Sequence, residues 1–484
     1  MSGLIGSLQN SSGALRVHSK GLEVAGKNLA NINNRGYSKQ RVEIGDRGSV
    51  DTGIATESMG VEAMGLRQNR DALLDKSVMR EITSTSSLEA AKKVLESAET
   101  ALGQFLDRTK DSTSIQNASG ASGGGISDAL TDFFNAWESF SVKPNDVGER
   151  QLLLAKAQIL VDKINATDKR LEQVQKDADA QLTTDVGVVN DLLAEIAKTN
   201  EYIAKAELVR PFSAVDLRDQ RQAKLEELSQ YINVQFQPIV PDGLGQITVT
   251  SNGINLIDGK NVLGKYEYDL NSAAPTASNT RLKFNAVDDA NDSTFNLGNL
   301  PEGKLGAQIT ASTSDVKDAR DAISLLATNL RSSINSVYQQ VDTINNPQFF
   351  SETAAGSKIT LNSAITANNL KASSRTGAND IALQIAGLGT DAIPGLGTNV
   401  TFVGHFNKTV TIIAQELNTT NVRLEDQKLS QEMAVNNRDA FSGVSQDEEM
   451  TDMMKFQRSF QASARHVNVI DSLLDQVVNR LGVG

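Results

Sequence analysis

Residues 4–32, LIGSLQNSSGALRVHSKGLEVAGKNLANI, and residues 453–481, MMKFQRSFQASARHVNVIDSLLDQVVNRL, carry apolar residues at a seven-residue period. Such a repeat predicts two helices, each with a narrow apolar seam that a partner helix must cover. At 1.5 Å per residue, helices over 4–32 and 450–481 would be rods of roughly 43 and 48 Å. Because their lengths match, we predict that the two ends of the chain pair as a coiled coil. The predicted seam comprises Leu4, Leu8, Leu15, Leu22, Leu29, Ile32, Met453, Phe456, Phe460, Val467, Ile470, Leu474, Val477 and Leu481.

An alternative is that both segments are ordinary amphipathic helices lying on a globular core. Their position at the extreme ends of the chain, where chains usually fray, argues against this interpretation.

The composition limits the kind of protein that this chain can be. A chain of 484 residues is too long for one hydrophobic core, so several domains are expected. Lys and Arg number 47 against 59 Asp and Glu, and the net charge of −12 disfavours binding to nucleic acid or to anionic membranes. No apolar run is long enough to cross a bilayer, and the first residues lack the pattern of a secretory signal, so we expect a soluble, unprocessed chain. The absence of cysteine excludes disulfides and thiolate metal sites.

The interior of the sequence is helical on both sides of an irregular, β-rich middle. Helical spacing covers residues 70–106, 126–140, 149–206, 323–337 and 406–441, and the first of these is either one helix or two with a bend at Thr83–Ser87. Residues 246–258 alternate around Asn252-Gly253, which predicts a β-hairpin.

We therefore predict a mainly α fold with an inserted β-rich domain. Its parts are a domain of paired terminal coiled-coil helices, a helical rod domain, and an outer irregular or β-rich domain. The predicted boundaries are 1–65 with 442–484 for the terminal domain, 66–233 with 307–345 and 404–441 for the rod, and 234–306 with 346–403 for the outer domain.

Residue types that carry catalysis or bind metals are not clustered in this sequence. The three histidines, His18, His405 and His466, are far apart, whereas a metal site needs several ligands together. The acidic run at residues 288–292 lacks the glycine and closing glutamate of a calcium loop, so a polar turn is favoured. Ser445 and Glu448 have the spacing of a helix capping box, which accounts for the acidic residues there. We predict no enzyme activity, no cofactor and no metal site.

Residues 30–40, ANINNRGYSKQ, resemble the "A-N-x-x-T-x-G-Y-x-R-Q" signature of flagellar rod, hook and hook-associated proteins. Asn34 stands where this family usually has Thr, and Lys39 where it usually has Arg. The resemblance adds Asn31, Gly36, Tyr37 and Gln40 to the predicted assembly interface.

Further matches favour, within this family, the subunits that join hook to filament. Residues 70–75, RDALLD, are similar to their "RDxxLD" segment, and residues 219–229 are similar to their "DQRDxLLxxLS" run. Residues 442–449, SGVSQDEE, followed by Phe456-Gln457 and Ser463-Ala464, resemble the end of their sequence. The matches cover both termini and the helical half of the chain, and they leave the middle domain almost unconstrained.

The resemblance implies a structural subunit of the flagellum that leaves the cell through the flagellar export apparatus and acts at the hook–filament junction. It implies as partners further copies of this chain in a ring or helical array, the hook protein, hook-associated protein 3 and an export chaperone, but neither nucleic acid nor a membrane. The chaperone is expected to cover the exposed C-terminal seam in the cytoplasm before export, at Phe456, Phe460, Val467, Ile470 and Leu474. One alternative is flagellin or hook-associated protein 3, and another is a secreted enzyme that carries flagellar-type ends.

Overall fold

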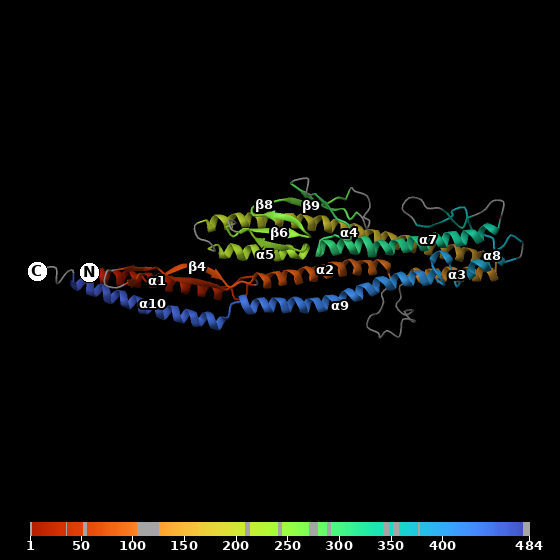
Figure 1. The fold of residues 1–484 in the computed structure, drawn as a ribbon. Helices are drawn as coiled ribbons and strands as arrows, with labels where there is room; N and C mark the ends of the chain where they lie inside the picture. The colour runs from red at the N-terminus through yellow and green to blue at the C-terminus, as the bar shows by residue number, and fades with distance from the viewer. Residues whose placement is uncertain are drawn as a thin grey trace.

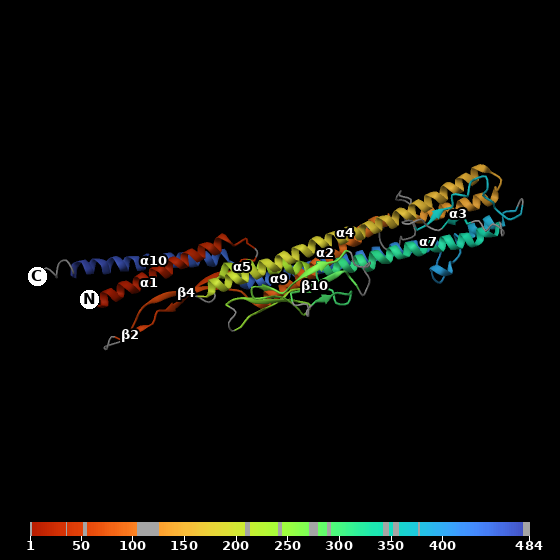
Figure 2. The ribbon, with the colours of Figure 1, turned by 90° about the horizontal axis from the view of Figure 1, so that it is seen from above.

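The chain forms a long, narrow molecule with both termini at one end (Figure 1). The computed structural model describes residues 2–34, 36–51, 56–103, 125–208, 213–240, 244–270, 279–287, 292–341, 348–351, 358–375 and 378–477. The molecule has three parts. A pair of terminal helices with a β ribbon is followed along the long axis by a helical rod, and small antiparallel sheets lie on the side of the rod (Figure 2).

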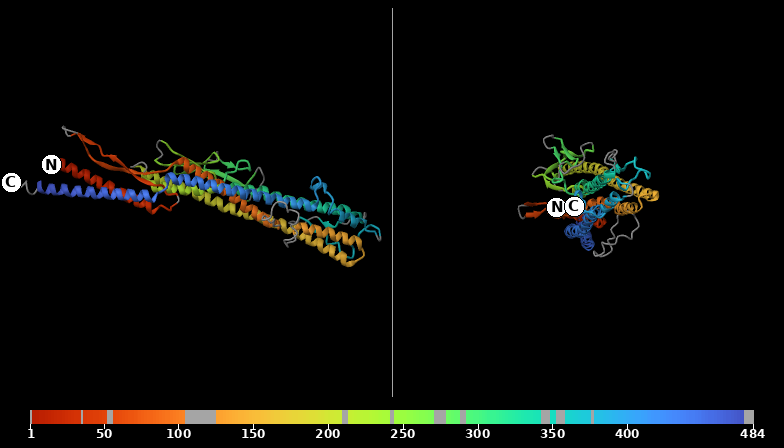
Figure 3. Two further views of the ribbon diagram at one scale, coloured as in Figure 1. Left: turned by 90° about the horizontal axis from the view of Figure 1, so that it is seen from below. Right: turned by 90° about the vertical axis from the view of Figure 1, so that its right-hand side faces the viewer.

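The terminal part pairs helix α1 (Ser2–Ala30) with helix α10 (Gln446–Asp475), which lie side by side. A long two-stranded ribbon packs on α1 as well, as the left view of Figure 3 shows. The ribbon consists of β1 (Gln40–Asp46) and β4 (Val61–Gln68), extended by β2 (Ser49–Asp51) and β3 (Thr56–Ser58). The predicted pairing of the two ends is therefore confirmed.

The rod is built from long helices that run along the axis of the molecule. They are α2 (Ala72–Leu102), α3 (Ile126–Val142), α4 (Val147–Glu207), α5 (Val215–Tyr231), α7 (Lys317–Tyr338) and α9 (Phe402–Ser442), together with the short α6 (Lys304–Thr310) and a π-helical turn η2 (Ala311–Val316). Helix α2 runs unbroken through Thr83–Ser87, so the sequence forms one helix there rather than two. The Thr83 hydroxyl is buried between the carbonyls of Met79 and Ser229, which satisfies it without interrupting the helix.

The inserted β region lies against α4. One sheet has the order β5 (Gln235–Pro238), β6 (Ile247–Ser251), β7 (Ile254–Asp258), β8 (Asn261–Val262), and the other the order β11 (Ser293–Thr294), β10 (Leu282–Ala286), β9 (Gly264–Tyr268). Asn252 and Gly253 join β6 to β7 with φ of 51° and 80°, as a two-residue hairpin turn of type I′ requires. The predicted hairpin is confirmed.

Residues 346–403, the second part of the expected outer domain, do not pack in the same core as residues 234–306. Strands β12 (Phe350–Ser351) and β13 (Thr360–Leu361), helix α8 (Asp380–Gly387) and the short helical turns η3 (Gln339–Val341) and η4 (Pro394–Leu396) gather at the end of the rod far from the termini (Figure 1). Phe349 packs against the rings of Phe133 and Trp137 of α3, and Phe350 packs against Phe133. Residues 234–306 instead share a core with α4 and α5. The two segments thus belong to different cores, unlike the single outer domain expected from the sequence.

Candidate functional site

Helix α1 approaches α10 closely at Gly21. A Cβ atom on Gly21 would lie 2.7 Å from the ring of Phe456, and Val17, Val24 and Ala25 of α1 are buried. The Ser11 hydroxyl and the His466 ring nitrogen Nδ1 are 2.7 Å apart across the pair. The two helices therefore approach closely at Gly21, where Phe456 covers the glycine backbone.

The predicted seam residues occupy several environments. Ile470 is buried in the pair, Ile32 and Phe460 are exposed, and Leu481 lies outside the described residues. The remaining seam residues are partly buried: Leu4, Leu8, Leu15, Leu22, Leu29, Met453, Phe456, Val467, Leu474 and Val477.

The chain changes direction at an elbow between α9 and α10. Helix α9 ends at Ser442, and α10 begins at Gln446 after the extended residue Gly443. The loop after α1 is bonded to this elbow, because the Lys39 amide donates to the Ser442 carbonyl over 2.9 Å. The Asn69 side-chain amide donates to the Phe441 carbonyl over 2.5 Å.

A buried ion pair joins the same loop to the start of α10. The Lys39 ammonium lies 2.6 Å from a Glu448 oxygen and 3.0 Å from a Glu449 oxygen, and the Lys39 and Glu449 side chains are only 4% and 2% exposed. Burial alone would lower the pKa of Lys39, but its hydrogen bonds to Glu448 and Glu449 outweigh burial and raise the pKa. Lys39 therefore remains charged at physiological pH.

Asn28 connects four backbone and side-chain groups at this place. Its Nδ2 donates to the Gln40 carbonyl and to Glu449, and its Oδ1 accepts from the Gln40 amide and from the Tyr37 hydroxyl. Burial, assisted by the nearby carboxylate of Asp219, raises the pKa of Tyr37, so its hydroxyl stays protonated and can donate. A side-chain amide can make four hydrogen bonds, so Asn28 is fully satisfied although only 1% exposed.

Arg70 ties the loop to the rod. Its guanidinium donates to the Gly36 carbonyl over 2.9 Å, to Asp219 of α5 over 2.7 Å and to Asp75 of α2 over 3.1 Å. Gly36 has φ of 94°, a backbone conformation that favours glycine. Burial raises the pKa of Asp219 to about 6, despite the opposing charge and hydrogen bond of Arg70. We call this set the elbow latch: Asn28, Tyr37, Lys39, Gln40, Asn69, Arg70, Asp219, Glu448 and Glu449.

The structure places the four predicted signature residues in two ways. Tyr37 and Gln40 are members of the elbow latch, and the Gly36 carbonyl accepts a hydrogen bond from Arg70 of the latch. Gln40 Nε2 also donates to Asp216 of α5 over 2.9 Å. Asn31 instead donates to the Lys27 carbonyl at the end of its own helix. Sequence reasoning missed Asn28, although a polar residue next to an apolar stripe was a usable signal.

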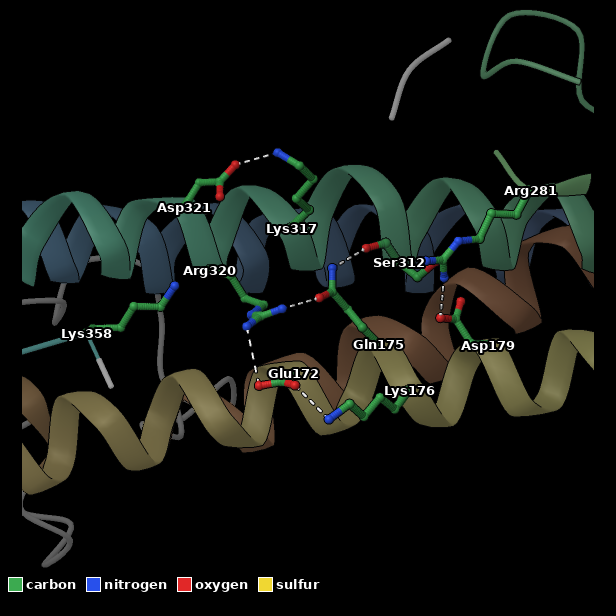
Figure 4. A pocket seen from close by; sticks show the side chains of 10 residues that line it. All are labelled: Glu172, Gln175, Lys176, Asp179, Arg281, Ser312, Lys317, Arg320, Asp321 and Lys358. Carbon is green, nitrogen blue, oxygen red and sulfur yellow. Dashed lines mark hydrogen bonds and ion pairs between the residues drawn. The ribbon is translucent and has the colours of Figure 1, made fainter. Parts of the chain in front are cut away.

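A second cluster of charges lies midway along the rod, where a cleft of about 350 Å³ separates α4 from α7 (Figure 4). Its cations already have carboxylate partners. Arg281 binds Asp179 at 3.0 Å, and Arg320 lies 3.6 Å from Glu172. The ion pair of Arg281 with Asp179 therefore joins the β region to the rod, and each described cation that lines the cleft has a carboxylate within 3.7 Å. Over the residues that the structure describes, no group of side chains has the arrangement of a metal site, and no helix could span a membrane.

The long rod with paired ends and a fixed elbow defines an elongated structural subunit. A family model described as the flagellar hook-associated protein FlgK helical domain matches residues 112–350, and a model described as the flagellar basal body rod FlgEFG protein C-terminal matches residues 438–481. The chain is a member of the flagellar hook-associated protein 1 family, a family of structural flagellar proteins.

The chain is similar to named proteins of several bacteria and to one solved structure. Flagellar hook-associated protein 1 of Bacillus subtilis is 25% identical over 99% of this chain and 98% of its own length. The proteins of the same name from Escherichia coli and Salmonella typhimurium are 23% and 24% identical, and the aligned regions cover 57% and 53% of their lengths. A solved structure, the flagellar hook junction protein FlgK from Burkholderia pseudomallei, is 22% identical, with a TM-score of 0.46 over 58% of this chain and 47% of that one.

Proposed function

We propose that this chain joins the flagellar hook to the filament, with the α1–α10 pair as its assembly element. The observation that carries the proposal is the elbow latch. It joins residues 421 positions apart through Asn28 and Glu449, and so fixes the paired ends at one angle to the rod. A junction subunit needs such a fixed angle, because its ends must stack in register while the rod meets neighbouring subunits.

The proposal includes the route and the partners of the subunit. The chain would be exported through the flagellar export apparatus and would then contact the hook protein on one side and hook-associated protein 3 on the other. Before export, a chaperone would bind the apolar seam of α10, which a free subunit cannot leave exposed without risk of aggregation.

Deletion of the coding sequence tests the proposed function. We expect cells with hooks but without filaments, and flagellin released into the medium. Wild-type protein should restore filaments, whereas Lys39→Met should restore them poorly, because it leaves the buried Glu449 carboxylate without its cation. Normal filaments in the deletion strain would contradict the proposal. A gold-labelled subunit found along the whole filament would instead favour flagellin.

A further inference from the structure

A histidine ring lies inside the terminal pair of α1 and α10. His18 occupies a seam position of α1, seven residues after the buried Ser11 and seven before the buried Ala25. Its ring packs beside the ring of Phe456, with 6.3 Å between the ring centroids. The His18 Nδ1 atom is buried and has no hydrogen-bond partner among the described residues. A positive charge on this ring would therefore lack the hydrogen bond that a buried charge needs.

The contacts across the terminal pair show which residues lie opposite His18. Three contacts define the register of the two helices: Ser11 with His466, Gly21 with Phe456, and Asn28 with Glu449. From one contact to the next, the two helices advance by equal numbers of residues in opposite directions. The helices are therefore antiparallel in one register, and this register puts Ser459 opposite His18.

The charged side chains nearest to His18 on the two helices are all positive. Four of them lie within one turn of His18 or of Ser459: Arg16, Lys20, Lys455 and Arg458. Along either helix the closest carboxylate is that of Glu23, which already binds Lys20 at 2.6 Å. Strands β1 and β4, which pack on α1, contribute exposed charges of both signs: Arg41, Glu43, Asp46, Glu62 and Arg67. A protonated His18 would thus add a fifth positive charge to four on the helices.

The other histidine of the terminal pair has a different environment. His466 is exposed, and its Nδ1 lies 2.7 Å from the Ser11 hydroxyl oxygen. A hydroxyl group can donate or accept, so this hydrogen bond can form with a neutral or with a protonated ring. Protonation of His466 should therefore cost the pair little, which makes His466 the matched control for His18.

We propose that His18 makes the terminal pair sensitive to acid: α1 and α10 close over a neutral His18 ring, and protonation of the ring favours the open pair. Burial lowers the pKa of His18 from its usual 6.5, so the closed pair binds this proton less readily than the open pair does. The stability that the neutral ring contributes is therefore complete above pH 6.5 and is lost as the pH falls below that value.

Hydrogen exchange in the full chain tests this proposal. Protection factors of the α1 amides are compared at about pH 7.5 and about pH 5 for wild type, His18→Gln and His466→Gln. Relative to His18→Gln, wild type should lose protection in acid, by at most about thirtyfold, the limit for a ring that stays neutral in the closed pair. Wild type and His466→Gln should change alike. Parallel profiles of wild type and His18→Gln would overturn the proposal.

The comparison with His18→Gln is needed because two carboxylates of the elbow act in the opposite direction. Burial raises the pKa of Asp75 and of Asp219, so both favour the folded elbow as the pH falls. Both carboxylates are present in every chain compared, so their effect cancels in the ratio of wild-type to variant protection.

NMR titration of the histidine rings supplies a second, independent measurement. The chain has three histidines, so each ring signal can be assigned by its loss in a single variant. We expect the His18 ring to titrate below pH 6.5 in the full chain. Phe456→Ala removes the ring beside His18 and should move this titration back toward pH 6.5. Titration at or above pH 6.5 in wild type, or an unchanged midpoint in Phe456→Ala, would contradict the proposal.

This inference goes beyond the proposed function, because both measurements observe the terminal pair in the isolated chain. Acid-sensitive exchange together with normal filaments in the deletion strain would keep the role of His18 and reject the junction role. Filament loss together with parallel exchange profiles would keep the junction role and reject the role of His18.

Discussion

Asn28 holds the loop after α1, the ribbon and the start of α10 together through one side chain. Replacing Asn28 by Ala leaves the buried Glu449 carboxylate and the Gln40 backbone short of hydrogen-bond partners. Each buried polar group that loses its partner lowers the free energy of unfolding by about 1–3 kcal/mol. We expect faster hydrogen exchange in α1 and α10 and little change in the rod. Asn31→Ala is the matched control, because Asn31 is less buried and bonds only near its own helix end. Equal effects of the two substitutions would contradict the role of Asn28.

Asp219 makes the stability of the elbow dependent on pH. Its pKa is about 6 in the folded chain against 3.8 for a free side chain, so the folded state binds more protons between these values. Stability should therefore rise as pH falls from about 6 toward 4, by at most about 3 kcal/mol. Burial also raises the pKa of Asp75, which shares its partner Arg70 with Asp219. Asp75 therefore adds to the rise in stability at lower pH.

Replacing Asp219 by Asn removes one titrating group and should flatten this part of the pH profile. Urea denaturation of wild type and variant at several values between pH 4 and pH 7 measures the difference. An unchanged slope would show that Asp219 is ionised throughout that range.

At the scale of elements, the heptad repeat predicted that the ends pair but only partly predicted the buried face. Helix α1 lies between α10 and the β1–β4 ribbon, so Val17, Gly21 and Val24 are buried beside the heptad leucines. The elbow latch could not be found from periodicity, because it joins polar residues more than 400 positions apart whose contact depends on the elbow angle. The position of residues 346–403 was missed because aromatic burial against α3, rather than local strand pattern, determines it.

The close approach at Gly21 gives a test of the terminal pair as an element. Gly21→Ala places a methyl group against the ring of Phe456 and should weaken the pair, although Ala favours helix by about 1 kcal/mol. Gly26→Ala has open space and should stabilise α1 by about that amount. Proteolysis rates at the termini distinguish the two variants. A Gly21→Ala chain that resists cleavage as well as Gly26→Ala would mean that the ring moves at no cost.

At the scale of the whole molecule, stability is unevenly distributed. The two large hydrophobic cores lie in the rod, the β region and the far end, and neither includes residues of α1 or α10. A helix pair with few fully buried apolar residues opens locally at low cost. We expect limited proteolysis of the monomer to trim both ends to a stable fragment of about residues 70–441. Protection of residues 4–32 in the free monomer would contradict this expectation.

The same uneven stability determines how an export chaperone could bind. The proposed chaperone residues Phe456, Val467, Ile470 and Leu474 lie on the face of α10 that packs toward α1, so a chaperone in that seam must displace α1. Deleting residues 1–33 should therefore strengthen chaperone binding, whereas deleting residues 445–484 should abolish it. Titration calorimetry with the two truncated chains and the full chain measures both effects. Affinity retained after the C-terminal deletion would place the chaperone elsewhere, and affinity lost after the N-terminal deletion would show that the chaperone binds the intact pair.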